Sequence, residues 1–514
     1  MPRKYRIALI LAAVAAYFGY QHWARKPETA KPSTAVAARN ATPATATTFK
    51  LGNLAFHPCS LSPRFTGDTL EARCATLDVP EDRGNPAGRK ISLKIAWVPA
   101  DRDDAAEPDP VFMLAGGPGQ SALQSYPQSA AAFAETRKKR HIILVDQRGT
   151  GASNPLTCKE ETPDEVATPS DEAVRAHTQR CLDALNGHAD PRFYTTGDAI
   201  ADLEAVRQAI GAKQIDLVGI SYGTRVAQQY AAAYPASTRS VVLDSVVPNS
   251  LVLGNEMARN LDHALDLQFA LCAKTPECKQ RYGEPRVRLD ALMAQLKAAP
   301  VSVRYRDATT GESKEDQLTE ARVAGLVRMY AYMPMAASLL PLQLNEAAAG
   351  RYDGLMALSK MLGEQMENEM STGMQLSVIC SEDAGELKPD PADNGTLMGG
   401  DFVRVLAEQC KVWPKGSRTA NFRAPLKTGV PTLLLSGEFD PVTPPRYGDE
   451  VAKSLPNGRH LVLRGQGHNV IGAGCMPRLM AKFIDKADAK ALDVKCLAAL
   501  PYTPPFTGFY GWEP

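Results

Sequence analysis

Short apolar runs recur along this chain, and longer stretches with a helical spacing of apolar residues separate them. Runs dominated by Val, Ile and Leu are typical of strands buried in a parallel sheet. One helix is predicted over 195–210, where Thr195 or Thr196 can cap the first turn and Gly211 follows the last. Strands alternating with helices predict an α/β fold, a mostly parallel sheet with helices on both faces. The predicted strands are 75–79, 91–99, 111–114, 141–145, 215–218, 241–244, 431–436 and 460–463.

The stretch from 251 to 400 interrupts this alternation. Its pattern is helical, and it holds eleven of the fifteen methionines. We predict a largely helical cap inserted between core strands, with 49–250 and 401–514 forming the two parts of the core. The methionines either fill an ordinary apolar core or form an adaptable lid over a peptide or acyl pocket, and the two interpretations are compatible.

A G-x-S-x-G sequence stands at 219–223, directly after the predicted strand 215–218. An Ala-, Gln- and Tyr-rich helix is predicted next, over 224–234. Strand, G-x-S-x-G and helix in this order are the context of a nucleophile elbow, in which the serine hydroxyl stands above the sheet. Glycines on both sides permit the sharp turn. Ser221 is therefore the candidate nucleophile.

A serine hydroxyl needs a base to accept its proton and a carboxylate to orient that base. Both follow in the chain order nucleophile, acid, histidine that is typical of α/β-hydrolases. Asp440 follows the apolar strand 431–436 and is the candidate acid, with Glu438 as its rival. His468 follows strand 460–463 and is the candidate base.

The anion formed during acyl transfer needs backbone N–H donors. Tyr222, the residue after the nucleophile, is expected to supply one. The stretch 116–119, Gly-Gly-Pro-Gly, follows strand 111–114 and can supply the other from Gly117, because glycine lets the backbone approach a substrate closely. The alternative for this stretch is a plain Gly-Pro turn.

Composition excludes several function classes. The 514 residues carry a net charge of +1, so there is no basic excess with which to bind nucleic acid. The sequence has no phosphate-binding P-loop, dinucleotide-binding glycine pattern or H-E-x-x-H zinc motif. We therefore predict no cofactor, no metal and no nucleic-acid partner. The oligomeric state is not indicated.

The N-terminus reads as a targeting segment. Arg3, Lys4 and Arg6 precede an apolar run over 7–20. Residues 1–26 are thus a signal peptide or an uncleaved membrane anchor. An Ala-, Thr- and Pro-rich linker is predicted over 27–48. We expect an exported protein, periplasmic or secreted, with anchoring to the inner membrane as the alternative.

Ten cysteines support export, because disulfides persist in oxidising compartments. Many pairings are possible from sequence alone, and buried thiols are the alternative to any pairing. The cysteines fall as near neighbours along the chain, and we predict sequential disulfides. The predicted pairs are Cys59 with Cys74, Cys158 with Cys181, Cys272 with Cys278, Cys380 with Cys410, and Cys475 with Cys496.

These motifs together resemble a known family. The stretches 116–119, 146–151, 219–223, 437–444 and 467–468 are similar to those of the proline iminopeptidase group of serine peptidases. With the export signal and the cysteines, the chain is most similar to the secreted tripeptidyl aminopeptidase branch. The resemblance spans about 50–500 and implies an α/β-hydrolase fold with a cap. It also implies a peptide substrate, cleaved near its free N-terminus, with residues such as Asp146 and Arg148 supporting the site.

The resemblance also directs attention to Cys380-Ser381-Glu382-Asp383, because acidic residues after a cysteine recur in this branch. A free α-amine is cationic, with a pKa of about 8, and a water-poor pocket must pair that charge with a carboxylate. Glu382 and Asp383 are therefore candidate amine-binding residues. The alternative is two solvated carboxylates in a loop.

Three functions remain open from the sequence. A serine exopeptidase acting on peptide N-termini is the leading prediction. An esterase or other acyl hydrolase is the runner-up, since the same triad serves both reactions. A non-catalytic binding protein on a hydrolase scaffold is the third.

Overall fold

A computed structural model describes residues 47–62, 69–158, 170–307, 310–366 and 370–511. The predicted signal or anchor lies outside these residues, and so does the predicted linker apart from its last two positions. Within the described residues, no helix is both long enough and apolar enough to span a membrane.

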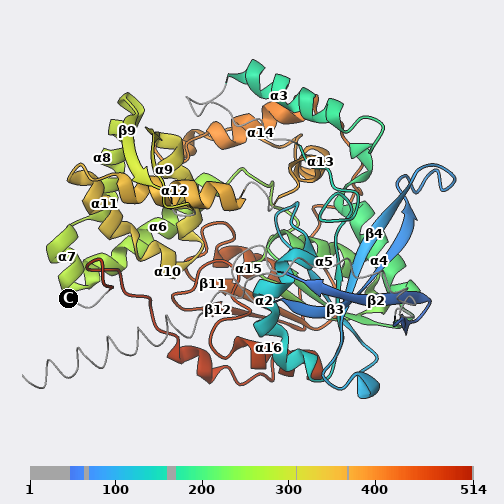
Figure 1. Cartoon of the computed structure of the whole chain (residues 1–514). Coiled ribbons are helices and arrows are strands. Elements are labelled where there is room, and N and C mark those ends of the chain that lie inside the picture. The colour runs from blue at the N-terminus through green and yellow to red at the C-terminus, as the bar shows by residue number, and fades with distance from the viewer. Residues whose placement is uncertain (1–46, 63–68, 159–169, 308–309, 367–369, 512–514) are drawn as a thin grey trace, which may run out of the picture. The chain divides into compact units, whose positions relative to one another are not determined.

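One sheet of ten strands forms the centre of the molecule (Figure 1). Its order is β1-β2-β3-β4-β6-β5-β7-β8-β11-β12. The pairs from β1 to β6 are antiparallel, and those from β6 to β12 are parallel. The prediction of a mostly parallel sheet is confirmed, with an antiparallel edge built from the early strands. The ten strands are β1 (Phe49–Leu51), β2 (Leu54–Leu61), β3 (Leu70–Pro80), β4 (Lys90–Val98), β5 (Val111–Leu114), β6 (Ile142–Val145), β7 (Ile215–Ile220), β8 (Thr238–Asp244), β11 (Thr432–Gly437) and β12 (Gly458–Leu463).

Each face of the sheet has its own apolar core, because successive side chains of a strand point to opposite faces. In β5, Phe112 and Leu114 pack with residues of α4 and α5, whereas Val111 and Met113 pack with residues of α2 and α16. All four side chains are buried. Helices therefore cover both faces, as predicted. The helices of the core are α2 (Ala122–Arg137), α3 (Asp171–Ala184), α4 (Thr196–Ala209), α5 (Tyr222–Ala233), α15 (Pro445–Ala452) and α16 (Met476–Lys486).

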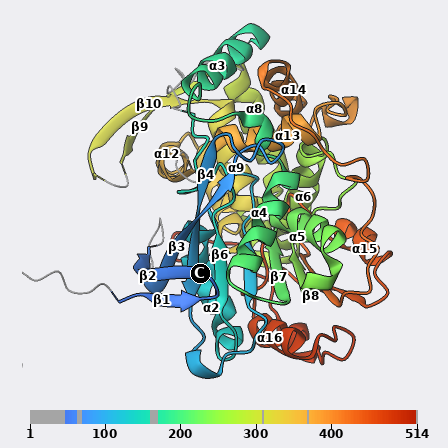
Figure 2. The same cartoon turned by 90° about the vertical axis from the view of Figure 1, so that its right-hand side faces the viewer.

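A long insert separates β8 from β11; its helices α6 to α12 lie to the left of the core in Figure 1, and α13 and α14 lie above it. Its helices α6, α8, α9, α11 and α12 enclose an apolar core of their own, whereas α13 and α14 pack into the core of the α4/α5 face. The insert is mostly helical, but it also contains a hairpin of β9 (Val301–Arg306) and β10 (Ser313–Leu318), which projects from it in Figure 2. Its helices are α6 (Met257–Lys274), α7 (Pro276–Tyr282), α8 (Pro285–Ala298), α9 (Glu320–Ala331), α10 (Pro334–Ala337), α11 (Leu340–Ala348), α12 (Asp353–Met366), α13 (Thr372–Glu382) and α14 (Asp401–Val412).

All ten cysteines form disulfides, and each bridge joins cysteines that follow one another in the sequence. The bridged cysteines are between 6 and 30 residues apart. Each bridge therefore closes a short local loop, for which a contribution of about 2–4 kcal/mol to stability is typical.

Candidate active site

The G-x-S-x-G stretch forms a sharp turn between β7 and α5. Ser221 has φ 54° and ψ −123°, a conformation that a non-glycine residue rarely adopts. A Cβ at Gly219 would overlap the carbonyl oxygen of Gly223, and a Cβ at Gly223 would overlap that of Leu114. Both glycines are thus required by close backbone approach, and the turn places Ser221 at the carboxyl end of the parallel strands.

Asp440 and His468 meet at the same edge of the sheet. The Nδ1 atom of His468 lies 2.8 and 3.0 Å from the two carboxylate oxygens of Asp440. Asp440 also accepts hydrogen bonds from the N–H groups of Val442 and Thr443 and from the Thr443 hydroxyl. With Nδ1–H donated to Asp440, the Nε2 atom of His468 is left to accept a proton.

Opposite charges control the ionisation of this pair. Burial disfavours the Asp440 carboxylate, but the charge and the hydrogen bond of His468 outweigh it and hold the pKa of Asp440 below its usual range. Burial lowers the pKa of His468, but the charge and hydrogen bond of Asp440 and the charge of Asp244 outweigh that effect, so the pKa of His468 is raised. The arrangement favours a carboxylate that stabilises a protonated imidazole.

Glu438, the rival acid, is engaged elsewhere. One carboxylate oxygen accepts a hydrogen bond from the N–H of Gly465 at 2.7 Å, and the other accepts one from the Tyr502 hydroxyl at 3.2 Å. Glu438 thus binds the C-terminal tail, whereas Asp440 holds the histidine.

The Gly-Gly-Pro-Gly loop lies against the nucleophile. A Cβ at Gly116 would be 3.1 Å from Cβ of Ser221, so only glycine leaves this contact unstrained. Gly117 is exposed and has φ 106°. Tyr222 begins α5 directly after Ser221. Of the two proposed oxyanion donors, Tyr222 follows the serine in the chain, and Gly117 follows the glycine that contacts it.

A cavity of about 110 Å³ opens beside this loop. Gly116, Ile220 and Asn469 line it next to the candidate triad. Uncharged polar side chains from the start of α2, such as Gln124 and Ser125, line the rest. The cavity can hold several water molecules or a polar part of a substrate.

The insert reaches the candidate base through Tyr332, which follows α9. The Tyr332 carbonyl oxygen accepts a hydrogen bond from the N–H of His468 at 2.9 Å. Its ring meets the imidazole edge-on, with the ring centroids 5.1 Å apart. A Cβ at Gly467 would overlap the same carbonyl oxygen. Sequence reasoning missed Tyr332, because nothing in a helical, methionine-rich stretch marks one tyrosine as a neighbour of the histidine.

Glu382, one of the two candidate amine-binding residues, is buried and bonded within the protein. Only 2% of its surface is exposed. Its two oxygens accept hydrogen bonds from the N–H and hydroxyl groups of Thr196, and that hydroxyl lies 2.7 Å from the Tyr222 hydroxyl. Burial raises the pKa of Glu382 to about 7. Its carboxylate thus caps the start of α4 behind the elbow.

Asp383 is fully buried and already paired with two cations. Its carboxylate lies 2.7 Å from Arg423 and 3.4 Å from Arg225. Neither carboxylate is free for a substrate amine, and neither is a solvated loop residue. The sequence could not indicate this outcome, because it depends on α13 packing against the core.

Two further predicted supports are buried beneath the site. Asp146 accepts hydrogen bonds from the Ser121 hydroxyl and from the N–H groups of Leu123 and Ala152. It thereby joins the loop after β6 to the start of α2. This is the supporting role expected from the resemblance.

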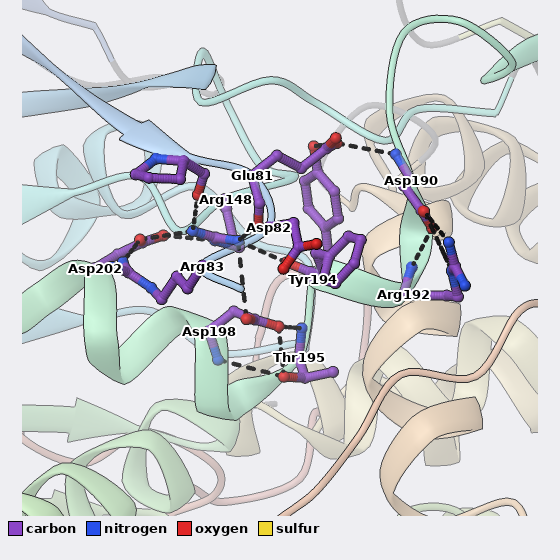
Figure 3. Close-up of polar contacts among 12 residues, drawn as sticks. Glu81, Asp82, Arg83, Arg148, Asp190, Arg192, Tyr194, Thr195, Asp198 and Asp202 are labelled. Atoms are coloured by element: carbon purple, nitrogen blue, oxygen red, sulfur yellow. Dashed lines mark hydrogen bonds and ion pairs between the residues drawn. The ribbon is translucent and has the colours of Figure 1, made fainter. Parts of the chain in front are cut away.

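Arg148 forms the centre of a buried polar network (Figure 3). Its guanidinium donates to both oxygens of Asp202, at 2.6 and 2.7 Å, and to the carbonyl oxygens of Glu81 and Phe193. Arg83 also contacts Asp202. The network ties the end of β3 and helix α4 to the loop after β6.

We expect Arg148→Ala to lower the free energy of unfolding by about 3 kcal/mol, because Asp202 would keep a buried charge with Arg83 as its remaining partner. Urea denaturation would measure the loss. Arg192→Ala is the matched control, since Arg192 pairs with Asp190 at the surface and its side chain is 57% exposed. Equal stability of both variants would contradict a supporting role for Arg148.

A second Ser-His-Asp group lies on β11, β12 and α15. The Ser436 hydroxyl is 2.9 Å from Nε2 of His460, and Nδ1 of His460 is 2.8 Å from Asp449. Ser436 is fully buried in β11, the last strand but one of the sheet, so no substrate can reach its hydroxyl. This group is structural.

Comparison with known proteins agrees with the fold. Residues 109–472 match the family described as alpha/beta hydrolase fold. The chain belongs to this family. The serine protease Hip1 of Mycobacterium tuberculosis strain H37Rv is 24% identical over 468 residues, which cover 83% of this chain and 87% of that protein. Family and relative together identify a serine hydrolase.

Two other relatives carry different activities in their names. A tripeptidyl aminopeptidase of Streptomyces lividans is 29% identical over 192 residues, or 34% of this chain and 35% of that protein. A carboxylesterase B of Mycobacterium tuberculosis strain CDC 1551 is 28% identical over 444 residues, covering 76% of this chain and 80% of that protein.

Proposed function

We propose that the protein is an exported serine exopeptidase that cleaves peptide bonds near free N-termini. The observation that carries the proposal is the 2.8 Å contact between His468 and Asp440, at the same sheet edge as the Ser221 elbow. The serine protease and tripeptidyl aminopeptidase relatives support a peptide substrate. The five disulfides support an oxidising compartment.

In the proposed reaction, the Ser221 hydroxyl attacks the scissile carbonyl and passes its proton to Nε2 of His468. The amides of Gly117 and Tyr222 stabilise the oxyanion. His468 then donates the proton to the leaving amine, and Asp440 stabilises the imidazolium in both steps. Water releases the acyl group by the same route in reverse.

Contact between the insert and the base supports cleavage near chain ends. The Tyr332 contacts place part of the insert beside His468, and we propose that the insert leaves the site partly closed. A chain terminus enters such a site more easily than a loop of a folded protein. Glu382 and Asp383 are paired within the protein, so we do not assign the terminal amine to them.

Turnover of three substrates tests this function: a tripeptide naphthylamide with a free amine, its N-acetylated form, and a p-nitrophenyl ester. We expect the free amine to raise kcat/KM by about 100-fold over the acetylated form, because acetylation removes the charge that the site must recognise. Equal turnover of both peptides would contradict an exopeptidase.

An esterase is the second candidate function, because the carboxylesterase relative aligns over most of the chain. The same triad hydrolyses esters. Rapid turnover of the ester, with neither peptide cleaved, would support this alternative.

A further inference from the structure

Asp244 at the end of β8 and Ser245 after it bond to the nucleophile and to the residue that follows the base. The N–H of Ser221 donates a hydrogen bond to the carbonyl oxygen of Asp244 at 2.9 Å. The N–H of Asn469, next to His468, donates to the Ser245 hydroxyl at 2.8 Å. Strand β8 lies between β7, which carries the nucleophile, and the strands that carry the acid and the base. The segment Asp244-Ser245 is therefore bonded both to Ser221 and to the loop that carries His468.

The Asp244 side chain continues this support. Its oxygens accept hydrogen bonds from the N–H of Val470, at 2.9 Å each, and one also accepts from the N–H of Ile471 at 3.0 Å. Ser245 and Asn469 have φ 60° and 68°, in the left-handed region that non-glycine residues seldom adopt. The hydrogen bonds hold this unusual backbone, and with it the loop that carries His468.

The charge of Asp244 has an uncommon environment. The residue is fully buried, and among the described residues no lysine or arginine forms an ion pair with it. The charged groups that face it are His468 and Asp440, and those that face His468 are Asp440 and Asp244. Since a buried carboxylate is costly without a cation, His468 is the neighbour whose protonation stabilises it.

We propose that Asp244 is a positioning residue for His468 and supplies a second negative charge, besides that of Asp440, to stabilise the imidazolium formed during both steps of the reaction. The inference rests on the proposed Ser221-His468-Asp440 triad. It does not depend on whether the substrate is a peptide or an ester, because the imidazolium forms in either case.

A charged Asp244 should affect the pH dependence of kcat/KM. Burial raises the pKa of Asp244 to about 6, so the group is charged at neutral pH. Its charge helps to raise the pKa of His468. Removing that charge must lower the pKa of His468, and the acid limb of kcat/KM, where the base becomes protonated, must then move to lower pH.

The experiment measures kcat/KM for p-nitrophenyl acetate from pH 4.5 to 9 in the full-length protein, Asp244→Asn and Ser245→Ala. We expect Asp244→Asn to lower the plateau about tenfold and to move the acid limb down by about 1 pH unit. Ser245→Ala removes a hydrogen bond to the same loop but keeps the charge. It should slow turnover and leave the acid limb in place. An unmoved acid limb in Asp244→Asn would overturn the proposal.

Asp244→Glu keeps the proposal falsifiable if Asp244→Asn does not fold. Glutamate retains the charge in a displaced position, so we expect slower turnover with the acid limb near its original pH. A limb shifted down by 1 unit or more in this variant would contradict a role for the charge. Ser221→Ala separates the two levels of inference. If Ser221→Ala still turns over substrate, both the proposed triad and the role of Asp244 are contradicted. If Ser221→Ala is inactive but the acid limb of Asp244→Asn does not move, only the role of Asp244 is contradicted.

Discussion

Ser221→Ala should abolish covalent labelling by a fluorophosphonate and lower kcat by about five to six orders of magnitude. Without the hydroxyl no acyl-enzyme forms, and only binding and the oxyanion donors continue to assist water. His468→Ala should cost nearly as much, because the members of a triad act as one unit. Gel detection of a fluorescent phosphonate and steady-state hydrolysis of an ester measure both effects.

Ser436→Ala is the matched control for this prediction. Ser436 bonds to His460, which bonds to Asp449, so the connectivity imitates that of a triad. It is fully buried in β11, and the variant should label like the parent protein. If Ser221→Ala labelled normally while Ser436→Ala did not, the site would have to be reassigned to the second group.

Asp440→Asn should lower kcat by about four orders of magnitude with little effect on folding. The amide occupies the same volume, but it carries no charge and cannot replace the carboxylate that accepts the Nδ1–H hydrogen bond. His468 therefore loses both its orientation and the stabilisation of its imidazolium. The 2.8 Å contact makes this loss specific to Asp440. Steady-state kinetics and thermal unfolding would separate catalysis from stability.

Glu438→Gln is the control for the acid. Its oxygens bind the Gly465 amide and the Tyr502 hydroxyl, so the variant should loosen the C-terminal tail and leave kcat within about tenfold. A larger loss in Glu438→Gln than in Asp440→Asn would transfer the role of catalytic acid to Glu438.

Local sequence signals predict the core of this fold well. The run Val111-Phe112-Met113-Leu114 is β5, and its four buried side chains explain why no polar residue interrupts it. Helix α4 begins at the predicted cap, where Thr195 and Asp198 form a reciprocal capping box. Such elements are specified by neighbours in the chain, so a pattern of a few residues is enough to find them.

The hairpin in the insert has a local sequence pattern of its own. Val301, Val303 and Tyr305 alternate with polar residues, as expected for a strand with one buried face. Helical patterns and methionines lie on either side of these strands, so the region as a whole predicts a helical cap.

The residues of the site also fall into those that local sequence motifs locate and those that they do not. The serine, acid and base follow strands in a recognisable order, so sequence motifs locate them. The roles of Tyr332 and Asp244 depend instead on contacts between distant parts of the chain, such as the bond from Val470 to Asp244, 226 residues away. The pairing of Asp383 with Arg423, at 2.7 Å, likewise joins residues 40 positions apart. No local pattern reports such contacts, because they arise only when the insert and the loops pack on the core.

The sequential disulfides have a consequence for how the protein reaches its folded form. Each cysteine is bridged to the next one along the chain, with no bridge enclosing or crossing another. In a chain threaded through a membrane pore N-terminus first, the partner of every unpaired cysteine is the next cysteine to emerge. An oxidase that joins cysteines in their order of arrival would therefore produce the native set directly, without an isomerase to correct it.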